Sequence, residues 1–208
     1  MNSNTHNILS FKSYLEEQTK GKGLTIFDID ETLFKTRALI RVMKDGKIVR
    51  SLDNQQYNEY KLQPGETYDY GEFKNAQVFH DTSIPIWSMI NKAKAIITNA
   101  VNAGSKVIIV TARANFDDKK KFLDTFRRYG IDIDNVYVER AGNLNLGSSA
   151  KNKRFIFHKY LRSGKFERVR FFDDAMSNIT MFKALEKQYP NVSFEAYHVK
   201  HDGSIRKV

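Results

Sequence analysis

Short apolar runs alternate with stretches of helical periodicity along most of this chain. The apolar runs predict strands over residues 24–27, 106–110, 135–138, 168–172 and 192–199. Apolar side chains at helical spacing, with glycine or proline at the stops, predict helices over residues 8–18, 82–103, 117–129, 150–162 and 177–189. Because strands that alternate with helices form βαβ units, we expect an α/β fold, a Rossmann-like doubly wound parallel sheet with helices on both faces.

Residues 35–81 do not fit this alternation. A parallel crossover needs only about a dozen residues, and the helix expected from residue 82 already supplies one. Two strand-like runs, 38–43 and 47–52, flank Asp45-Gly46, a strong signal for a hairpin turn. An aromatic-rich stretch follows, whose tyrosines we expect to build a small core for the hairpin. We therefore predict a core of residues 1–34 and 82–208, with residues 35–81 inserted after the first strand as a small cap.

Composition narrows the range of functions. The chain has 208 residues and no cysteine, which excludes disulfides, thiol catalysis and cysteine metal sites. No apolar run approaches the ~20 residues of a membrane span, and the first residues do not resemble a secretory signal. We expect a cytoplasmic protein without a membrane partner. The formal net charge of +10 favours anionic partners, although a well-solvated surface explains it equally well.

Acidic side chains close two of the expected strands. Asp28 and Asp30 follow the first strand in the run FDIDET, and Asp173 and Asp174 end the strand FFDD. Ligands of open α/β sheets bind beyond the carboxyl ends of the strands, so these carboxylates should meet there. Carboxylates held together need a proton or a cation. Oxygen ligands suit Mg²⁺, and the histidines are scattered without zinc spacing.

Such a cluster suits phosphate chemistry. A bound metal would screen the approach of an anionic phosphate and polarise its oxygens. One carboxylate can then attack phosphorus to form an aspartyl-phosphate. A second can give a proton to the leaving oxygen and later take one from water.

Three segments carry a family resemblance. FDIDETLF resembles the first motif, DxDx(T/V), of haloacid dehalogenase-like (HAD) phosphatases. VIIVTAR resembles their second motif, an apolar strand that ends in Ser or Thr, and RVRFFDDAMSN resembles their fourth motif in its double-aspartate form. The order fits a core from residue 24 to about residue 199. The resemblance implies a Mg²⁺-dependent phosphatase.

The resemblance also implies roles for the acidic residues. Asp28 would be the nucleophile and a metal ligand. Asp30 would be the general acid and base, and its backbone carbonyl would bind Mg²⁺. Asp173 and Asp174 would complete the metal site, and either could be the direct ligand.

Five further residues are expected around the phosphate. Thr111 would hydrogen-bond the transferring phosphoryl group, and Thr32 would brace the first-motif loop on the substrate side. The lysine of the third family motif would be Lys153 or Lys151, and the spacing from the helix cap favours Lys153. Arg113 could clamp a substrate phosphate with two hydrogen bonds; the alternatives are an ordinary loop arginine or an ion pair to the nearby acids at 117 and 118.

Other readings of the same residues remain open. The substrate would be a phosphorylated small molecule, such as a nucleotide or sugar phosphate, or a nucleic-acid end. Arg37, Arg41 and the tyrosines of the cap are candidate contacts, since tyrosines can also stack on nucleic-acid bases. A receiver-like phosphoacceptor module also gathers acids and a lysine at strand ends. A non-catalytic anion-binding protein could use the same scaffold. A P-loop kinase is disfavoured, because GxxxxGK[ST] is absent. Asn178 would orient the loop of Asp173 and Asp174, cap its helix or simply be solvated.

Overall fold

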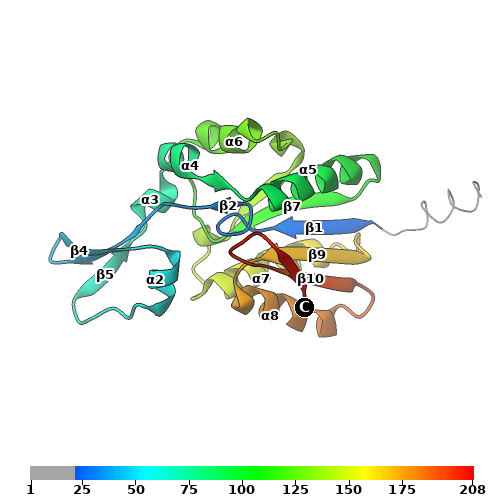
Figure 1. Cartoon of the computed structure of the whole chain (residues 1–208). Coiled ribbons are helices and arrows are strands. Elements are labelled where there is room, and N and C mark those ends of the chain that lie inside the picture. Colours follow the sequence, from blue (N-terminus) through cyan, green and yellow to red (C-terminus); the bar gives the residue numbers. More distant parts are fainter. Residues whose placement is uncertain (1–21) are drawn as a thin grey trace, which may run out of the picture.

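The computed structural model describes residues 22–208, so the helix expected over residues 8–18 lies outside it. Within this part, the fold is mixed α/β around a six-stranded sheet (Figure 1). Its strands are β1 (Gly23–Phe27), β7 (Lys106–Thr111), β8 (Tyr137–Arg140), β9 (Arg168–Asp173), β10 (Ser193–Val199) and β11 (Ile205–Lys207). The order across the sheet is β11-β10-β9-β1-β7-β8, and all neighbours are parallel except β10 and β11. The expected parallel sheet is therefore present.

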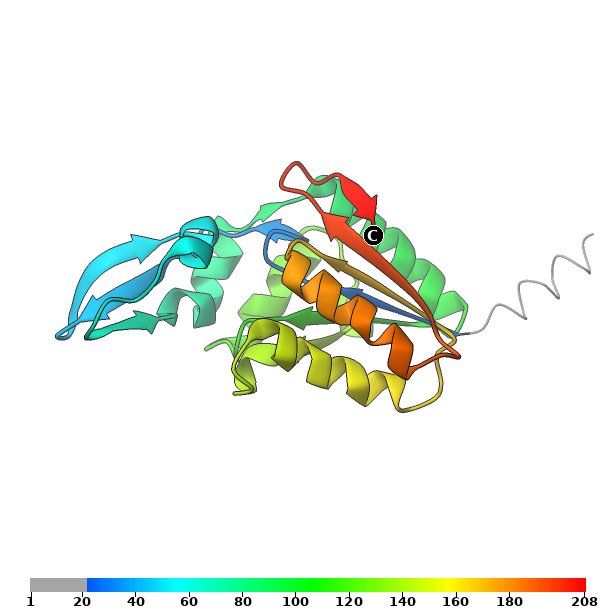
Figure 2. The same cartoon turned by 90° about the horizontal axis from the view of Figure 1, so that it is seen from below.

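Helices cover the two faces of this sheet. Apolar residues of α5 (Trp87–Asn102) and α6 (Lys119–Arg128) pack with Phe27 on one face, and those of α7 (Ser149–Leu161) and α8 (Met176–Ala184) pack with Leu24 and Ile26 on the other. This division follows from the alternation of side chains along a strand. Figure 2 shows α7 and α8 side by side in front of the sheet and α5 behind it. No helix in residues 22–208 is long and apolar enough to cross a membrane.

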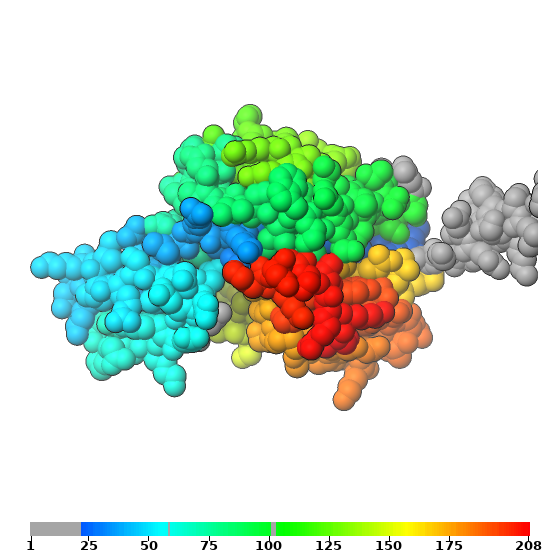
Figure 3. All heavy atoms as spheres, viewed as in Figure 1, coloured from blue at the N-terminus to red at the C-terminus, as the bar shows by residue number. Residues whose placement is uncertain are grey.

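The insertion is a separate three-stranded sheet with short helices. Two short strands, β2 (Phe34–Lys35) and β6 (Ile84–Pro85), pair at its base. Between them come β3 (Ile40–Lys44), β4 (Lys47–Leu52), α2 (Asn54–Glu59), β5 (Glu66–Asp69), α3 (Gly71–Lys74) and α4 (Ala76–Thr82), with the sheet in the order β4-β3-β5. In the space-filling view the insertion (cyan) forms a lobe beside the hairpin of β10 and β11 (red) (Figure 3).

The sequence anticipated two details of the insertion. Asp45 and Gly46 join β3 to β4, and both have positive φ angles, 50° and 74°, as a tight hairpin turn requires. Three of the tyrosines, Tyr57, Tyr60 and Tyr68, pack on the buried apolar residues of β3 and β4. They build a small core, as predicted.

One expected helix begins later than predicted. We predicted a helix over residues 82–103, but Thr82 is the last residue of α4, and α5 begins only at Trp87. Pro85 lies in β6 rather than in the first turn of a helix. Proline has no N–H, so it suits a two-residue edge strand that needs few hydrogen bonds. The Ile86 N–H donates to the Leu33 carbonyl, which ties the start of α5 to the loop after β1.

Smaller differences concern element ends. The strand expected over residues 135–138 is Tyr137–Arg140, because residues Ile133–Asn135 form a 3₁₀ turn. The helix expected over residues 177–189 ends at Ala184, and another 3₁₀ turn covers Glu186–Gln188. Strand β11 was not predicted. These segments carry little periodicity of their own, so tertiary pairing decides their form.

Candidate active site

The candidate site lies where the strand order of the sheet reverses. From β1 the chain proceeds to β7 and β8 on one side, and it then returns to β9 and β10 on the other. Crevices at such points, beyond the carboxyl ends of the strands, are where open α/β sheets bind ligands. Asp28 follows β1, Asp173 ends β9, and Thr111 ends β7. Three of the expected residues therefore close adjacent strands.

A buried lysine bridges two of the carboxylates. The Lys153 Nζ lies 2.7 Å from Asp28 Oδ1 and 2.7 Å from Asp173 Oδ2. Lys153 is 1% exposed and lies on the buried face of α7, whose first turn is capped by the Ser148 hydroxyl. Carboxylate oxygens of Asp28, Asp173 and Asp174 lie within 4.8 Å of one another, an arrangement that could hold a metal ion. We call these three residues the acidic cluster.

The two neighbouring aspartates have different surroundings. Asp173 is fully buried, and its oxygens accept hydrogen bonds from Lys153, from the Ala175 N–H and from the Asn178 amide. Asn178 thus orients Asp173. The Asp174 carboxylate accepts no hydrogen bond from another residue of the described chain. Its backbone carbonyl accepts from His198 Nε2 at 2.9 Å. Asp174 is therefore better placed than Asp173 to bind a cation directly.

The cluster holds more negative charge than its surroundings favour. Burial raises the pKa of Asp28 to about 7; the Lys153 ammonium opposes this rise, and the carboxylate of Asp173 adds to it. Burial, followed by the charges of Asp173 and Asp28, raises the pKa of Asp174 to about 8. Burial alone would lower the pKa of Lys153, but Asp173 and Asp28 outweigh it and raise this pKa above its ordinary value. A cation would relieve this repulsion.

The Arg113 side chain makes contacts that the sequence did not predict. Its side chain is buried, and its Nε and Nη2 atoms donate to both oxygens of Asp30 over 2.7–3.2 Å. Nη1 donates to the Phe73 carbonyl, and Nη2 also donates to the Thr36 hydroxyl. All three nitrogens have partners within the protein, and the expected clamp on a substrate phosphate stays a prediction. An ion pair was anticipated, but with residues 117 or 118 and not with Asp30.

The remaining candidates are divided between the interior and the surface. Thr111 is buried, and its hydroxyl accepts from the Arg113 N–H at 3.1 Å. Thr32 is also fully buried, which fits the expected bracing role in the first-motif loop. Lys151 is exposed, and within the described residues it makes no hydrogen bond or ion pair with the acidic cluster; its N–H donates to the Ser148 hydroxyl. Of the two lysines, only Lys153 meets the carboxylates.

Two further features were not anticipated. A Cβ atom on Gly142 would lie 2.2 Å from the Ala112 carbonyl oxygen and 2.6 Å from the Ala114 nitrogen, so only glycine fits against this loop. The contact is tertiary, and nothing in the local sequence indicates it. His198 and Lys200 lie at the end of β10, close to Asp174. The strand-end argument that identified Asp28 would have found them too.

Comparison with known proteins assigns this chain to no family. No protein-family model matches it, and no curated protein matches it. Conclusions about its activity therefore depend on the residues and geometry of the site.

The first prediction concerns the pair of Arg113 and Asp30. Replacing Arg113 with Met should lower the free energy of unfolding by about 3–5 kcal/mol, because it leaves the partly buried Asp30 charge without its partner. Arg127 is a matched control, since it too is paired with carboxylates, those of Asp124 and Asp134, but at the surface. Arg127→Met should have a much smaller effect. Chemical denaturation of both variants measures the difference, and equal losses would contradict this account.

Proposed function

We propose that this protein hydrolyses phosphate monoesters through an aspartyl-phosphate formed on Asp28, as a HAD-like phosphatase. The observation that carries the proposal is the contact of Lys153 with Asp28 and Asp173 at the reversal point of the sheet. A nucleophilic carboxylate beside a fixed ammonium, with Thr111 at the end of the next strand, suits attack on an anionic phosphoryl group.

We also propose the finer architecture that this family would have. The sheet would be the doubly wound, Rossmann-like kind, which the helices on both faces support. Residues 35–81 would act as a cap on a core formed by residues 1–34 and 82–208. In support, the insertion leaves the core through β2 and β6, immediately after the Asp28 loop. Arg113 joins Asp30 to Thr36 and Phe73, one residue near each end of the insertion.

The cofactor we propose is Mg²⁺. Asp28 and Asp174 would hold it through carboxylate oxygens, with the backbone carbonyl of Asp30, and Asp173 would support the site from behind. The donor set fits, because it offers hard oxygen ligands and neither histidine nor cysteine. When bound, the ion would neutralise the carboxylates and polarise the phosphoryl oxygens.

The side chains suggest how the reaction would proceed. An Asp28 oxygen attacks phosphorus and the bond to the ester oxygen breaks, while Asp30 gives that oxygen a proton. Asp30 then takes a proton from the water that attacks the phosphorus, which releases phosphate and restores Asp28. Thr111 would hydrogen-bond the transferring group, and Lys153 would balance its charge. Because Arg113 holds both oxygens of Asp30, one oxygen must turn away from the guanidinium before it can transfer a proton.

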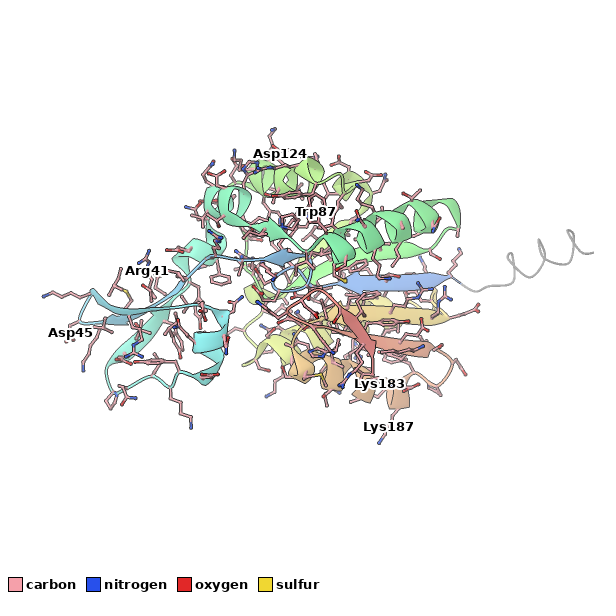
Figure 4. All side chains as sticks on the ribbon, viewed as in Figure 1. Arg41, Asp45, Trp87, Asp124, Lys183 and Lys187 are labelled. Carbon is pink, nitrogen blue, oxygen red and sulfur yellow. The ribbon has the colours of Figure 1, made fainter. Side chains whose placement is uncertain are left out.

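The second prediction tests the nucleophile. Asp28→Asn should lower the rate of phosphate release from p-nitrophenyl phosphate by at least about a thousandfold, because an amide cannot form the intermediate. Excess EDTA should abolish the activity of the unaltered protein. Asp45→Asn is the control, since Asp45 lies exposed at the tip of the insertion (Figure 4).

The possible outcomes of this experiment distinguish the phosphatase from the alternative functions. Full turnover in the Asp28 variant would overturn the proposed role of Asp28. Phosphorylation of Asp28 without turnover would favour a receiver-like phosphoacceptor. Failure of the unaltered protein to hydrolyse p-nitrophenyl phosphate or a panel of nucleotides and sugar phosphates would favour a non-catalytic anion-binding protein.

The third prediction concerns pH and metal. The pKa values of Asp28 and Asp174, about 7 and about 8, exceed those of unfolded aspartate, so the folded state binds more protons between about pH 4 and pH 8. The unfolding free energy of the metal-free protein should therefore fall as pH rises through this window. Added Mg²⁺ should restore stability above about pH 8, where both carboxylates are ionised.

Asp174→Asn should weaken both effects. It removes one buried negative charge, so the metal-free variant should melt at least about 2 °C higher than the unaltered protein near pH 8.5. It should also lose most of the stabilisation by Mg²⁺. Thermal unfolding with and without Mg²⁺ near pH 5.5 and near pH 8.5 provides the comparison, with Asp45→Asn as control. If Mg²⁺ stabilises the Asp174 variant as strongly as the control, Asp174 is not a ligand.

A further inference from the structure

A hollow of about 580 Å³ lies between the insertion and the end of β10. We call it the basic hollow, after Lys35, Arg37 and Lys200 in its lining. Asp174 also lines it, so it opens onto the acidic cluster. On the side of the insertion, Asn54 and Gln55 of α2 contribute to the wall. The hollow is therefore the space next to the phosphate site that we propose.

The three cations of the basic hollow have no carboxylate partner. Within residues 22–208, no Asp or Glu oxygen lies within 4.0 Å of the charged nitrogens of Lys35, Arg37 or Lys200, whereas Arg41 and Arg113 are both paired. The three residues come from two places in the chain: Lys35 and Arg37 lie at the end of β2 and just after it, and Lys200 lies in the turn after β10. Folding thus gathers unpaired positive charge at one opening.

The carboxylates of the basic hollow are already engaged. Glu31 accepts the Thr36 N–H at 3.1 Å and lies 3.7 Å from His201. Asp53 caps α2 by accepting the Gln56 N–H at 2.8 Å. Asp174 belongs to the acidic cluster. Each of these carboxylates has another partner, and none of them lies within 4.0 Å of the charged nitrogens of the three cations.

An anion at this position would belong to the leaving group of the substrate. If the scissile phosphoryl group lies at Asp28, the rest of the substrate can extend into the hollow that the neighbouring Asp174 lines. A neutral leaving group would leave three cations unused, whereas phosphate oxygens are strong acceptors for lysine and arginine. We propose that the basic hollow binds a second phosphate of the substrate. The substrate would be a bisphosphorylated small molecule or the phosphorylated end of a polynucleotide, and this inference rests on the proposed phosphatase function.

The test compares substrates with one and two phosphates. The unaltered protein should hydrolyse adenosine 3′,5′-bisphosphate with a kcat/KM at least about tenfold above that for adenosine 5′-monophosphate and for adenosine 3′-monophosphate, mainly through a lower KM. Raising the ionic strength should reduce this preference, because salt screens charges in an open site. A preference below about twofold at low salt would overturn the inference.

Removing positive charge from the basic hollow tests whether the hollow causes the preference for the bisphosphate. In Lys35→Gln/Lys200→Gln, the preference for the bisphosphate should fall about tenfold. The matched control is Lys183→Gln/Lys187→Gln, which removes the same charge from α8 and the turn after it, away from the insertion (Figure 4). The control should keep the preference of the unaltered protein. Equal losses in the two double variants would show that net charge, and not the basic hollow, attracts the second phosphate.

A binding measurement separates this inference from the proposed function. Calorimetry on the Asp28→Asn protein should show the bisphosphate binding at least about tenfold more tightly than either monophosphate, and the Lys35/Lys200 changes should remove the difference. Tight binding without hydrolysis by the unaltered protein would refute the phosphatase and keep the second-phosphate site. Hydrolysis with no preference for the bisphosphate, in either the kinetic or the binding assay, would keep the phosphatase and refute the second-phosphate site. A 3′-phosphorylated oligonucleotide, tested against the free bisphosphate, distinguishes the two sources of the second charge.

Discussion

The buried ammonium group of Lys153 is the interaction on which the site depends. Removing one ion from water into a protein interior costs several kcal/mol, and three ions are buried here. Lys153 contacts Asp28 and Asp173 at 2.7 Å each, and its raised pKa shows that this attraction exceeds the cost of burial. Without the ammonium, two carboxylates on adjacent strands would repel each other. The contact also fixes α7 against the ends of β1 and β9, so it serves the fold and the chemistry together.

A second buried cation connects the site to the insertion. Arg113 holds Asp30 on one side, and on the other it donates to Thr36 and to the Phe73 carbonyl. Its guanidinium also lies 4.5 Å from the centre of the Phe73 ring, a favourable arrangement for a cation. Gly142 allows its backbone loop to pack closely against the neighbouring turn. Movement of the insertion would therefore act directly on the residue proposed for proton transfer.

The elements that could be predicted from the sequence are those with a strong local signal. Apolar runs predicted the parallel strands, and Asp45-Gly46 predicted the hairpin. The strand-end argument brought Asp28 and Asp173 together because parallel strands share one edge. The spacing from the helix cap favoured Lys153 over Lys151, and Lys153 is the one that contacts the carboxylates.

What the sequence could not reveal depends on contacts between distant segments. Arg113 and Asp30 are 83 residues apart, and no spacing rule joins them. The late start of the helix expected over residues 82–103 follows from pairing of β6 with β2, which no local periodicity indicates. The basic hollow likewise exists only because the insertion folds back towards the end of β10.

The central claim is that Asp28 becomes phosphorylated. The most direct measurement is to quench the protein during turnover of p-nitrophenyl phosphate, reduce any acyl phosphate with borohydride and analyse the tryptic peptide 23–35 by mass spectrometry. Borohydride converts a phosphorylated aspartate to homoserine, so this account predicts homoserine at position 28. Homoserine at Asp30, or continued turnover with no reduced carboxylate in this peptide, would contradict it.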